Sequence, residues 1–544
     1  MKKLLFIFIM LGYGVIAIAQ EKFTLADELR GSITPQRAWW DLQHYSIKVD
    51  VLAQTKSLSG TNTITYTVLS PNSTMQIDLQ EPMRIDLVTQ NGKKVAVQRN
   101  GSAHFLKLPE PQIAGAQNKL VIRFSGAPTV ALNAPWDGGL VWSKDTNGID
   151  FIASANQGIG ASVWWPVKDH PQDEPDKGVD LFITTPKNLV GVGNGRLIEE
   201  ITNKDTKTWH WQVVNPINSY GVNINVGDYV NFSETYNGLN GKLDLSYWVL
   251  RDNLEIAKEQ FKQAPLMLEA FEYWFGPYPF YEDSFKLVEA PYLGMEHQSS
   301  VTYGNKYKNG YLGRDLSGTG WGLEFDFIII HEAGHEWFAN NITNKDVADM
   351  WIHEGFTAYS ENLYLNYHFG EKAASEYVIG TKRSIQNDIP LIGTYNKNNR
   401  GSNDMYYKGA NILHTLRQLI ADDQKWRAIL RGLNKDFYHQ TVTSHQVERY
   451  ISEKSGIHLT QFWEQYLRTT MIPNLQYSIQ ENQLRYRYTD IIQDFDMPVQ
   501  VKINGVLNWI QPTSTWKTLE NNGKIKTLDV QQDFLINSSL IKKQ

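Results

Sequence analysis

The chain has 544 residues, 42% of them hydrophobic and 20% charged, which are values typical of globular proteins. Its length is too great for one ordinary domain, so about three domains are expected. The formal net charge of −6, with no long basic run, argues against a nucleic-acid partner, and the absence of cysteine excludes disulfides.

Residues 1–19 are predicted to be a signal peptide. Lys2 and Lys3 give a positive start, residues 4–18 are apolar, and Ala17-Ile18-Ala19 is typical of a cleavage site. The alternative, an uncleaved membrane anchor, is disfavoured because the apolar stretch is short and ends in small residues. We expect cleavage after Ala19, export to the periplasm or beyond, and no membrane span in the mature protein.

Residues 20–235 are predicted to form an N-terminal β domain. Apolar and polar residues alternate over 45–51 and again over 64–68, the pattern of half-buried strands. Asn-Gly pairs at 91–92 and 147–148 are typical of the turns between such strands.

The pattern changes twice after this β domain. Residues 254–275 have helical spacing that stops at Gly276-Pro277, and Thr443 and Gly456 look like a helix start and a helix stop. From about residue 474 the chain alternates again. The predicted fold class is multidomain α+β, with an N-terminal β-sheet domain, an α-rich catalytic domain over 236–472 and a short C-terminal β-sandwich-like domain over 473–544.

Residues 331–335 read His-Glu-Ala-Gly-His, an HExxH motif, and Glu354 follows after eighteen further residues. Two histidines four apart lie on one face of a helix, so both rings can reach one metal ion. Glu332 is adjacent to the first histidine, where a base can act on a water. Two histidines and one carboxylate are typical of a catalytic zinc site because they leave the fourth position open. We predict one Zn²⁺ per chain, held by His331, His335 and Glu354, with Glu332 as the base.

The alternative is an amphipathic helix whose two histidines are satisfied by neighbouring groups. Residues 327–330 read Phe-Ile-Ile-Ile, which is too apolar for a solvated face. The motif therefore looks like a helix that carries polar groups into a core, where they need partners. A metal ion provides such a partner, and the chemistry of the set is that of peptide-bond hydrolysis.

Four stretches in order resemble the aminopeptidase N family of gluzincin zinc metallopeptidases, which also contains leukotriene hydrolases. Residues 331–340 and 351–356 match its zinc motif and the surroundings of its third ligand. Residues 294–298 resemble the family's G-x-M-E-N exopeptidase motif, 406–410 its Y-E-K-G-A motif, and 157–171 its region in which a Gln precedes R-x-x-F-P-C-x-D-x-P. The resemblance implies a thermolysin-like fold for the catalytic domain.

The resemblance also implies how substrate is held. Glu296 would pair with the free α-ammonium of a peptide, because a carboxylate in a partly desolvated cleft demands that charge. Gln157 would be a second amine-binding residue, although it is neutral here, and a polar loop residue is the alternative. The stretch Leu293, Gly294 and Met295 would bind the substrate backbone along an edge strand.

Two further roles follow from the resemblance. Tyr406 would donate its hydroxyl to the developing oxyanion, although Tyr407 beside it leaves the register to be tested. Asp349 would orient a zinc-ligating imidazole, with a helix-start carboxylate as the alternative.

The chain departs from the family pattern at positions that carry no catalytic group. The departures are Leu293 for Gly, His297 for Asn, Ser162 for Arg, Val167 for Cys and His353 for Asn. His297 is not expected to be a fourth zinc ligand, because that would close the site. The short C-terminal domain leaves no room for the family's frequent large helical domain, so we expect a more open cleft that admits longer peptides.

The leading hypothesis is an exported zinc aminopeptidase acting on peptides with a free N-terminus. A thermolysin-like endopeptidase would share the zinc spacing and would not need Glu296 or Gln157. A leukotriene-type epoxide hydrolase is possible within the family, but no residue points to it. A non-catalytic peptide- or glycan-binding protein on a peptidase scaffold would have a damaged metal set or base, and both are intact here.

Overall fold

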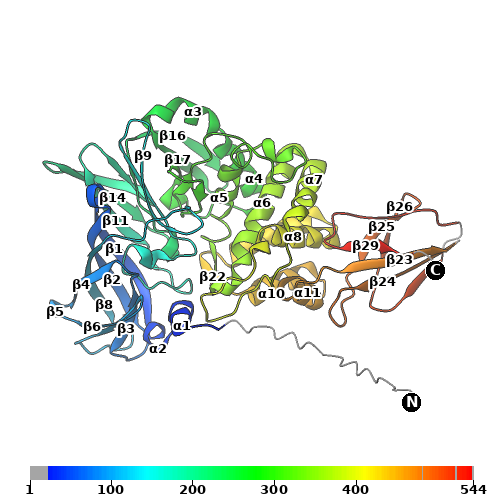
Figure 1. Ribbon diagram of the computed structural model, residues 1–544, viewed down its shortest axis with the longest axis horizontal. Coiled ribbons are helices and arrows are strands. Elements are labelled where there is room, and N and C mark those ends of the chain that lie inside the picture. Colours follow the sequence, from blue (N-terminus) through cyan, green and yellow to red (C-terminus); the bar gives the residue numbers. More distant parts are fainter. Residues whose placement is uncertain (1–21, 481, 521–523, 542–544) are drawn as a thin grey trace, which may run out of the picture.

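The computed structural model describes residues 22–480, 482–520 and 524–541, so the predicted signal peptide lies outside the described residues. Figure 1 shows a row of sheets at one end, helices in the middle and a smaller β-rich part at the other end. The predicted multidomain α+β class is therefore confirmed. No helix within the described ranges is both long and apolar enough to cross a membrane.

The N-terminal part is built on an eight-stranded sheet. Its central strand β1 (Trp40–Leu52) pairs antiparallel with β2 (Ser57–Val68) and parallel with β11 (Val179–Pro186). Tyr45 and Ile47 are fully buried, whereas Ser46 between them is not, so the predicted alternation is confirmed. The remaining strands of this sheet are β4 (Arg84–Gln90), β5 (Lys93–Lys94), β8 (Gln117–Gly126), β13 (Arg196–Thr202) and β14 (Thr206–Val213).

Two smaller sheets complete this part. The three-stranded sheet holds β3 (Thr74–Asp78), β6 (Ala96–Asn100) and β7 (Ala103–Lys107). The four-stranded sheet holds β9 (Gly139–Lys144), β10 (Asp150–Ala155), β12 (Val190–Val192) and β15 (Asn225–Gly227). The strands share one hydrophobic core, in which Trp164 and Trp165 are fully buried.

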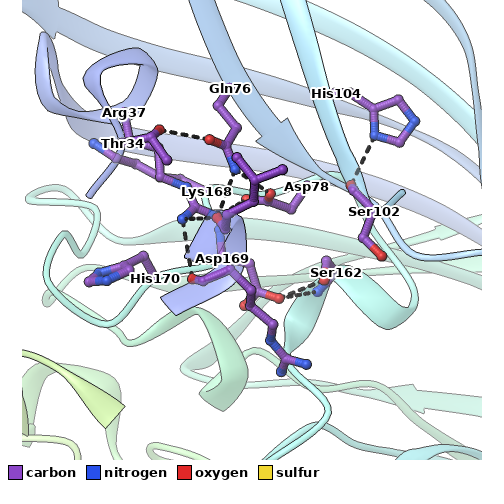
Figure 2. A network of polar contacts seen from close by, with 12 residues as sticks. Thr34, Arg37, Gln76, Asp78, Ser102, His104, Ser162, Lys168, Asp169 and His170 are labelled. Carbon is purple, nitrogen blue, oxygen red and sulfur yellow. Dashed lines mark hydrogen bonds and ion pairs between the residues drawn. The ribbon is translucent and has the colours of Figure 1, made fainter. Parts of the chain in front are cut away.

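Two short helices, α1 (Leu25–Gly31) and α2 (Pro35–Ala38), are fixed to these sheets by a buried polar network. Figure 2 shows this network, which includes the ion pair of Arg37 with Asp78, and Arg37 is fully buried. One nitrogen of Arg37 donates to the carbonyls of Leu29 and Ser32, at 2.7 and 2.8 Å, and the other pairs with Asp78. The network therefore fixes the carboxyl end of α1.

The catalytic part begins with a five-stranded sheet. It holds β16 (Tyr229–Gly238), β17 (Gly241–Leu250), β18 (Phe285–Glu289), β20 (Val301–Tyr303) and the short edge strand β19 (Gly294–Met295). The predicted domain boundary between residues 235 and 236 falls inside β16, because the β16–β17 hairpin continues into this sheet. The edge strand β19 is the element that faces the zinc motif.

Helices pack on this sheet around the longest of them, α6 (Trp351–Phe369) (Figure 1). The others are α3 (Leu254–Gln260), α4 (Gln263–Phe275), α5 (Phe327–Gly334), α7 (Glu371–Thr381), α8 (Tyr407–Ile420), α9 (Asp423–Asp436), α10 (Ser444–Ser455) and α11 (Thr460–Arg468). A parallel strand pair, β21 (Ile342–Asn344) with β22 (Gln440–Val442), lies among them. The helix α10 has a capping box at Thr443 and ends at Gly456 with a φ of 71°, as predicted.

The helix predicted over 254–275 is divided in two. Helix α3 ends at Gln260 and α4 begins at Gln263. Pro265 explains the break, because in a continuous helix its ring would clash with the carbonyl of Phe261, and it cannot donate a hydrogen bond to that carbonyl. Restarting the helix at residue 263 places the proline in a first turn, where its missing N–H is not needed.

The C-terminal part consists of two small sheets. One holds β23 (Asn474–Gln480), β24 (Gln483–Thr489), β27 (Lys517–Glu520) and β29 (Asn537–Leu540), and the other holds β25 (Val499–Ile503), β26 (Val506–Ile510) and β28 (Leu528–Val530). Their apolar residues belong to the same hydrophobic core as the catalytic helices. The hydroxyl of Tyr466 on α11 donates to the carbonyl of Leu535 at 2.7 Å, so this part is packed on its neighbour.

Candidate active site

The zinc motif lies at the end of a buried helix. Asp326 accepts hydrogen bonds from the amides of Ile328 and Ile329 and so begins α5. All eight residues of α5 are buried, and His331 and Glu332 lie in its last turn. His335 follows directly after the helix and is 1% exposed. The predicted helix that carries polar groups into a core is therefore present.

The third predicted ligand approaches from α6. Glu354 lies in the first turn of α6, and its Oε2 is 3.3 Å from Nε2 of His335 and 3.8 Å from Nε2 of His331. The two helices pack closely because residue 334 is glycine, where an added Cβ would lie 2.5 Å from Oγ of Ser360. The structure thus brings the three predicted ligands to one point, with their ligand atoms within 4.8 Å of one another.

The hydrogen bonds around this point fit a zinc ion. Nδ1 of His331 donates to Glu361 at 2.7 Å, and Nδ1 of His335 lies 3.0 Å from the carbonyl oxygen of Phe338. Both rings therefore keep Nε2 for another partner. Oε2 of Glu354 is buried and has no hydrogen-bond partner among the described residues, which is costly unless a cation is bound there. Three N and O donors with one open position are the ligand set of catalytic zinc.

Burial and mutual charge shift the pKa of every group in this cluster. Burial raises the pKa of Glu354, but the histidines outweigh it and hold the pKa well below its usual range. Burial, together with the charges of Glu296 and Glu354, raises the pKa of Glu332 to about 7, although both histidines oppose the shift. A carboxylate with a pKa near neutrality can both accept and return a proton, as a general base requires.

Glu332, the predicted base, is close to the edge strand because residue 294 is glycine. An added Cβ at Gly294 would lie 2.7 Å from Cγ2 of Ile328 and 3.0 Å from Oε1 of Glu332. A side chain there would displace either the helix or the base. Met295 and Leu293 on either side of this glycine line the same cleft, as the predicted backbone-binding stretch requires.

Glu296 and Gln157 are brought together, although 139 positions separate them in the sequence. The amide of Gln157 donates to Oε1 of Glu296 at 2.6 Å and to Oε1 of Glu354 at 2.8 Å. Glu296 is 2% exposed, and burial raises its pKa. A neutral amide at position 157 therefore bridges the predicted amine-binding carboxylate and the predicted zinc ligand.

Tyr406 lies immediately before α8 and lines the cleft. Its ring centroid is 6.1 Å from that of His331. Burial and the charge of Glu354 raise the pKa of Tyr406 well above its usual range, so its hydroxyl stays protonated and able to donate. Tyr407 also lines the cleft, and the choice between the two as oxyanion donor stays a prediction.

The prediction for Asp349 is wrong, because this carboxylate touches neither imidazole. It accepts hydrogen bonds from the hydroxyls of Tyr395 and Ser444 instead. The residue that orients His331 is Glu361, which the sequence analysis missed. Glu361 lies seven positions after Glu354, two turns along the same face of α6, and that spacing could have indicated it.

The two histidines that replace family asparagines take structural contacts. Nδ1 of His297 lies 2.8 Å from the Thr302 hydroxyl and 3.1 Å from the Asn223 amide, and burial lowers the pKa of His297 to about 3. His297 is not among the described residues that could hold a metal ion. Nε2 of His353 accepts from the Asn344 amide at 2.8 Å. Neither replacement blocks the fourth position of the zinc set.

These residues surround a cleft of about 340 Å³ between the N-terminal and catalytic parts. Its wall includes Gln157 and Glu296, the predicted amine-binding residues, and also Pro135 and Trp136 from the N-terminal part. The rest of the wall is formed by Tyr311, Leu316, Phe327, Ile328, Arg400, Asn403, Tyr406 and Tyr407. The cleft is within the range of sizes that hold a small ligand or the end of a peptide.

The comparisons with known proteins agree with this geometry. The family model "Peptidase M1 N-terminal domain" matches residues 42–220, and "Peptidase family M1 domain" matches 259–466. Leukotriene A-4 hydrolase of Xenopus laevis is 22% identical over 473 residues, which cover 80% of this chain and 73% of that protein. Endoplasmic reticulum aminopeptidase 1 of Homo sapiens is 22% identical over 422 residues, 73% of this chain but only 44% of that protein.

Solved structures show the same fold. An M1 zinc metallopeptidase from Deinococcus radiodurans superposes with a TM-score of 0.67 at 20% identity, covering 82% of this chain and 98% of that chain. The resemblance in motifs, the two matching family models and the donor set of the cleft lead to one conclusion. The chain belongs to peptidase family M1, the aminopeptidase N family of zinc metallopeptidases, and it is a peptidase with a zinc cofactor.

Proposed function

We propose that this protein is an exported aminopeptidase that removes N-terminal residues from peptides. The observation that carries the proposal is the contact of Gln157 with both Glu296 and Glu354. It places a buried carboxylate beside the zinc set at one end of the cleft. A buried carboxylate is stabilised by a cation, and the α-ammonium of a peptide with a free N-terminus supplies one.

The catalytic roles follow from the positions of the side chains. Zinc held by His331, His335 and Glu354 would lower the pKa of a water and polarise the scissile carbonyl. Glu332 would accept the proton of the attacking water and pass it to the leaving amine. Tyr406 would donate its hydroxyl to the oxygen of the carbonyl as negative charge develops there.

Glu296 and Gln157 would fix the length of the substrate on one side of the scissile bond. The ammonium would bind Glu296, so only one residue fits between the amine site and the zinc set. An endopeptidase needs room for the substrate chain on both sides of the scissile bond. In this protein Glu296 and Gln157 would occupy that room on the N-terminal side of the bond. This arrangement favours the aminopeptidase over the thermolysin-like endopeptidase.

The test compares alanyl arylamide with N-acetyl-alanyl arylamide, on wild-type protein and on Glu296→Gln. The wild type should cleave only the free amine at a measurable rate, and the variant should lose about 100-fold in kcat/KM on the free amine. Equal rates on the two substrates would exclude the amine role of Glu296. Cleavage of a peptide blocked at both ends would instead support an endopeptidase, and unchanged biological activity of Glu332→Gln would support a non-catalytic role.

Export is proposed from the sequence of residues 1–19 alone. N-terminal sequencing of the protein recovered from a cell fraction tests this proposal. A mature chain that begins at Gln20 in the periplasm or medium is the expected result. An intact Met1 in a cytoplasmic fraction would contradict it.

A further inference from the structure

Arg400 is the one lysine or arginine on the described wall of the zinc cleft, whose other charged or titratable residues are glutamate, histidine and tyrosine. It is exposed, and its Nη2 donates to Oδ1 of Asn403, another residue of the wall, at 3.0 Å. Among the residues that the structure describes, no carboxylate oxygen lies within 4.0 Å of its guanidinium. Most of its donors are therefore available to a ligand.

Arg400 lies on the wall of the same cleft as Glu296 and Gln157. Asn398, two residues earlier, lines a small cavity together with Gln157 and Tyr220. Burial raises the pKa of Tyr406, and the charges of Glu354 and Glu296 raise it further. The charge of Arg400 acts in the opposite direction and lowers this pKa. The segment 398–406 thus runs from the neighbourhood of Gln157 past Arg400 to the predicted oxyanion donor.

This segment is anchored, so Arg400 is presented from a fixed backbone. The amide of Asn398 donates to the carbonyl of Asp27 on α1 at 3.1 Å, and Lys397 forms an ion pair with Glu28. Gly31 packs so tightly on this segment that an added Cβ would lie 2.0 Å from the carbonyl carbon of Lys397. The buried network around Arg37 in turn holds α1 (Figure 2). A guanidinium on an anchored loop needs little reordering to bind.

The charges of the cleft therefore have a definite pattern. Glu296 offers a carboxylate for an ammonium, and Arg400 on the wall of the same cleft offers a guanidinium for an anion. An N-terminal aspartate or glutamate carries both complementary charges on one residue, an α-ammonium and a side-chain carboxylate. The planar guanidinium matches a carboxylate with two parallel hydrogen bonds.

We propose that Arg400 makes the enzyme selective for peptides whose N-terminal residue is acidic, by pairing with that side-chain carboxylate while Glu296 holds the α-amine. This inference rests on the proposed aminopeptidase function and names its substrate class. Arg400 acts as a specificity-determining residue and takes no part in bond breaking.

The experiment measures kcat/KM on glutamyl, glutaminyl and alanyl arylamides. Glutamyl and glutaminyl substrates have the same shape and differ in charge, and the arylamide removes any terminal carboxylate. The wild type should prefer glutamyl over glutaminyl by about tenfold or more, and Arg400→Gln should reduce that ratio to about one. Arg400→Lys should restore part of the ratio, because it keeps the charge without the planar fork.

Because the readout is a ratio, partial loss of folding or catalysis in a variant does not affect it. The control is Arg427→Gln on α9, which removes an equal charge from an arginine stacked on Tyr273, outside the cleft. It should leave both the ratio and the alanyl rate unchanged.

Three results would overturn the inference. The first is a wild type that prefers glutaminyl or shows no preference, and the second is an unchanged ratio in Arg400→Gln. The third is a charge effect found only between the dipeptides Ala-Glu and Ala-Gln, which would assign Arg400 to the second residue of the peptide. Hydrolysis of the alanyl arylamide with any of these results leaves the proposed aminopeptidase function intact, whereas no hydrolysis of all three arylamides removes that function itself.

Discussion

Two buried carboxylates, Asp78 in the N-terminal part and Glu354 in the zinc cleft, have opposite surroundings. They are 5% and 1% exposed. Asp78 accepts hydrogen bonds at both oxygens, from Gln76 at 2.9 Å on one side and from Arg37 and the Asp169 amide on the other (Figure 2). Glu354 accepts from Gln157 at one oxygen, and its other oxygen has no hydrogen-bond partner in the part of the chain that the structure describes.

The difference separates a structural cluster from a functional one. A buried charge is costly unless it is paired, and the residues around Asp78 pair it within the protein. Around Glu354 the protein supplies two imidazoles whose outer nitrogens are already occupied by Glu361 and Phe338, so both rings turn their free nitrogen inwards. Unsatisfied ligand atoms that converge on one point indicate a metal site, whereas a satisfied network indicates a fold contact.

The largest effect is expected from Glu332→Gln, which removes the base and leaves the ligands in place. The value of kcat should fall by about 10² to 10⁴, because glutamine cannot accept the proton of the attacking water. Zinc content, measured by atomic absorption, and the melting temperature should stay near those of the wild type. A fall in activity that matches a fall in zinc content would show that Glu332 is needed to hold the metal site, against the role proposed here.

Asp78→Ala should lower the stability of the protein by a free energy similar to the rise in activation free energy expected for Glu332→Gln. The change leaves Arg37 buried without a counter-charge, so the free energy of unfolding should fall by about 3–5 kcal/mol. Urea unfolding followed by tryptophan fluorescence measures this loss. The matched control is Asp86→Ala, which breaks the exposed pair with Arg84 at 3.1 Å and should cost less than about 1 kcal/mol. Equal losses in the two variants would contradict the comparison.

The zinc cluster around Glu354 was more predictable from the sequence than the cluster around Asp78. The zinc ligands were predictable because helical spacing and a short connection place them together. The pairing of Arg37 with Asp78 joins α2 to β3 across 41 positions, and no local pattern reveals such a contact. The contact of Gln157 with Glu296 spans 139 positions and was inferred only through the family resemblance. Asp349 was misassigned because proximity in sequence to Glu354 does not place it on the face of α6 that meets the histidines.

The next largest effect is expected on zinc affinity, from a change of Glu361, which orients His331, the first predicted ligand. Glu361→Gln keeps an acceptor for Nδ1 of His331 but removes the negative charge that strengthens the ligand, so zinc affinity should fall about 10- to 100-fold. Competition with a zinc chelator of known affinity measures this. The matched variant is Asp349→Asn, whose residue contacts Tyr395 and Ser444 and should leave zinc affinity unchanged. A larger loss in Asp349→Asn would restore the role predicted from the sequence.

The smallest effect is expected at Glu174, a carboxyl group whose one hydrogen-bond partner among the described residues is the Thr343 hydroxyl at 2.7 Å. Burial raises the pKa of Glu174 from its ordinary 4.5 to about 8. The folded state therefore keeps a proton that the unfolded state has lost, so the contribution to stability is complete below about pH 4.5 and is lost as the pH rises through about 8. Glu174→Gln cannot ionise and should remove this loss, which urea unfolding measured between about pH 5 and pH 9 detects. Thr343→Val removes the hydrogen bond that opposes the shift and should extend the loss to higher pH. If Glu174→Gln and the wild type lose stability in parallel over this range, the group ionises freely, and the contact between the two parts of the molecule is already open to water.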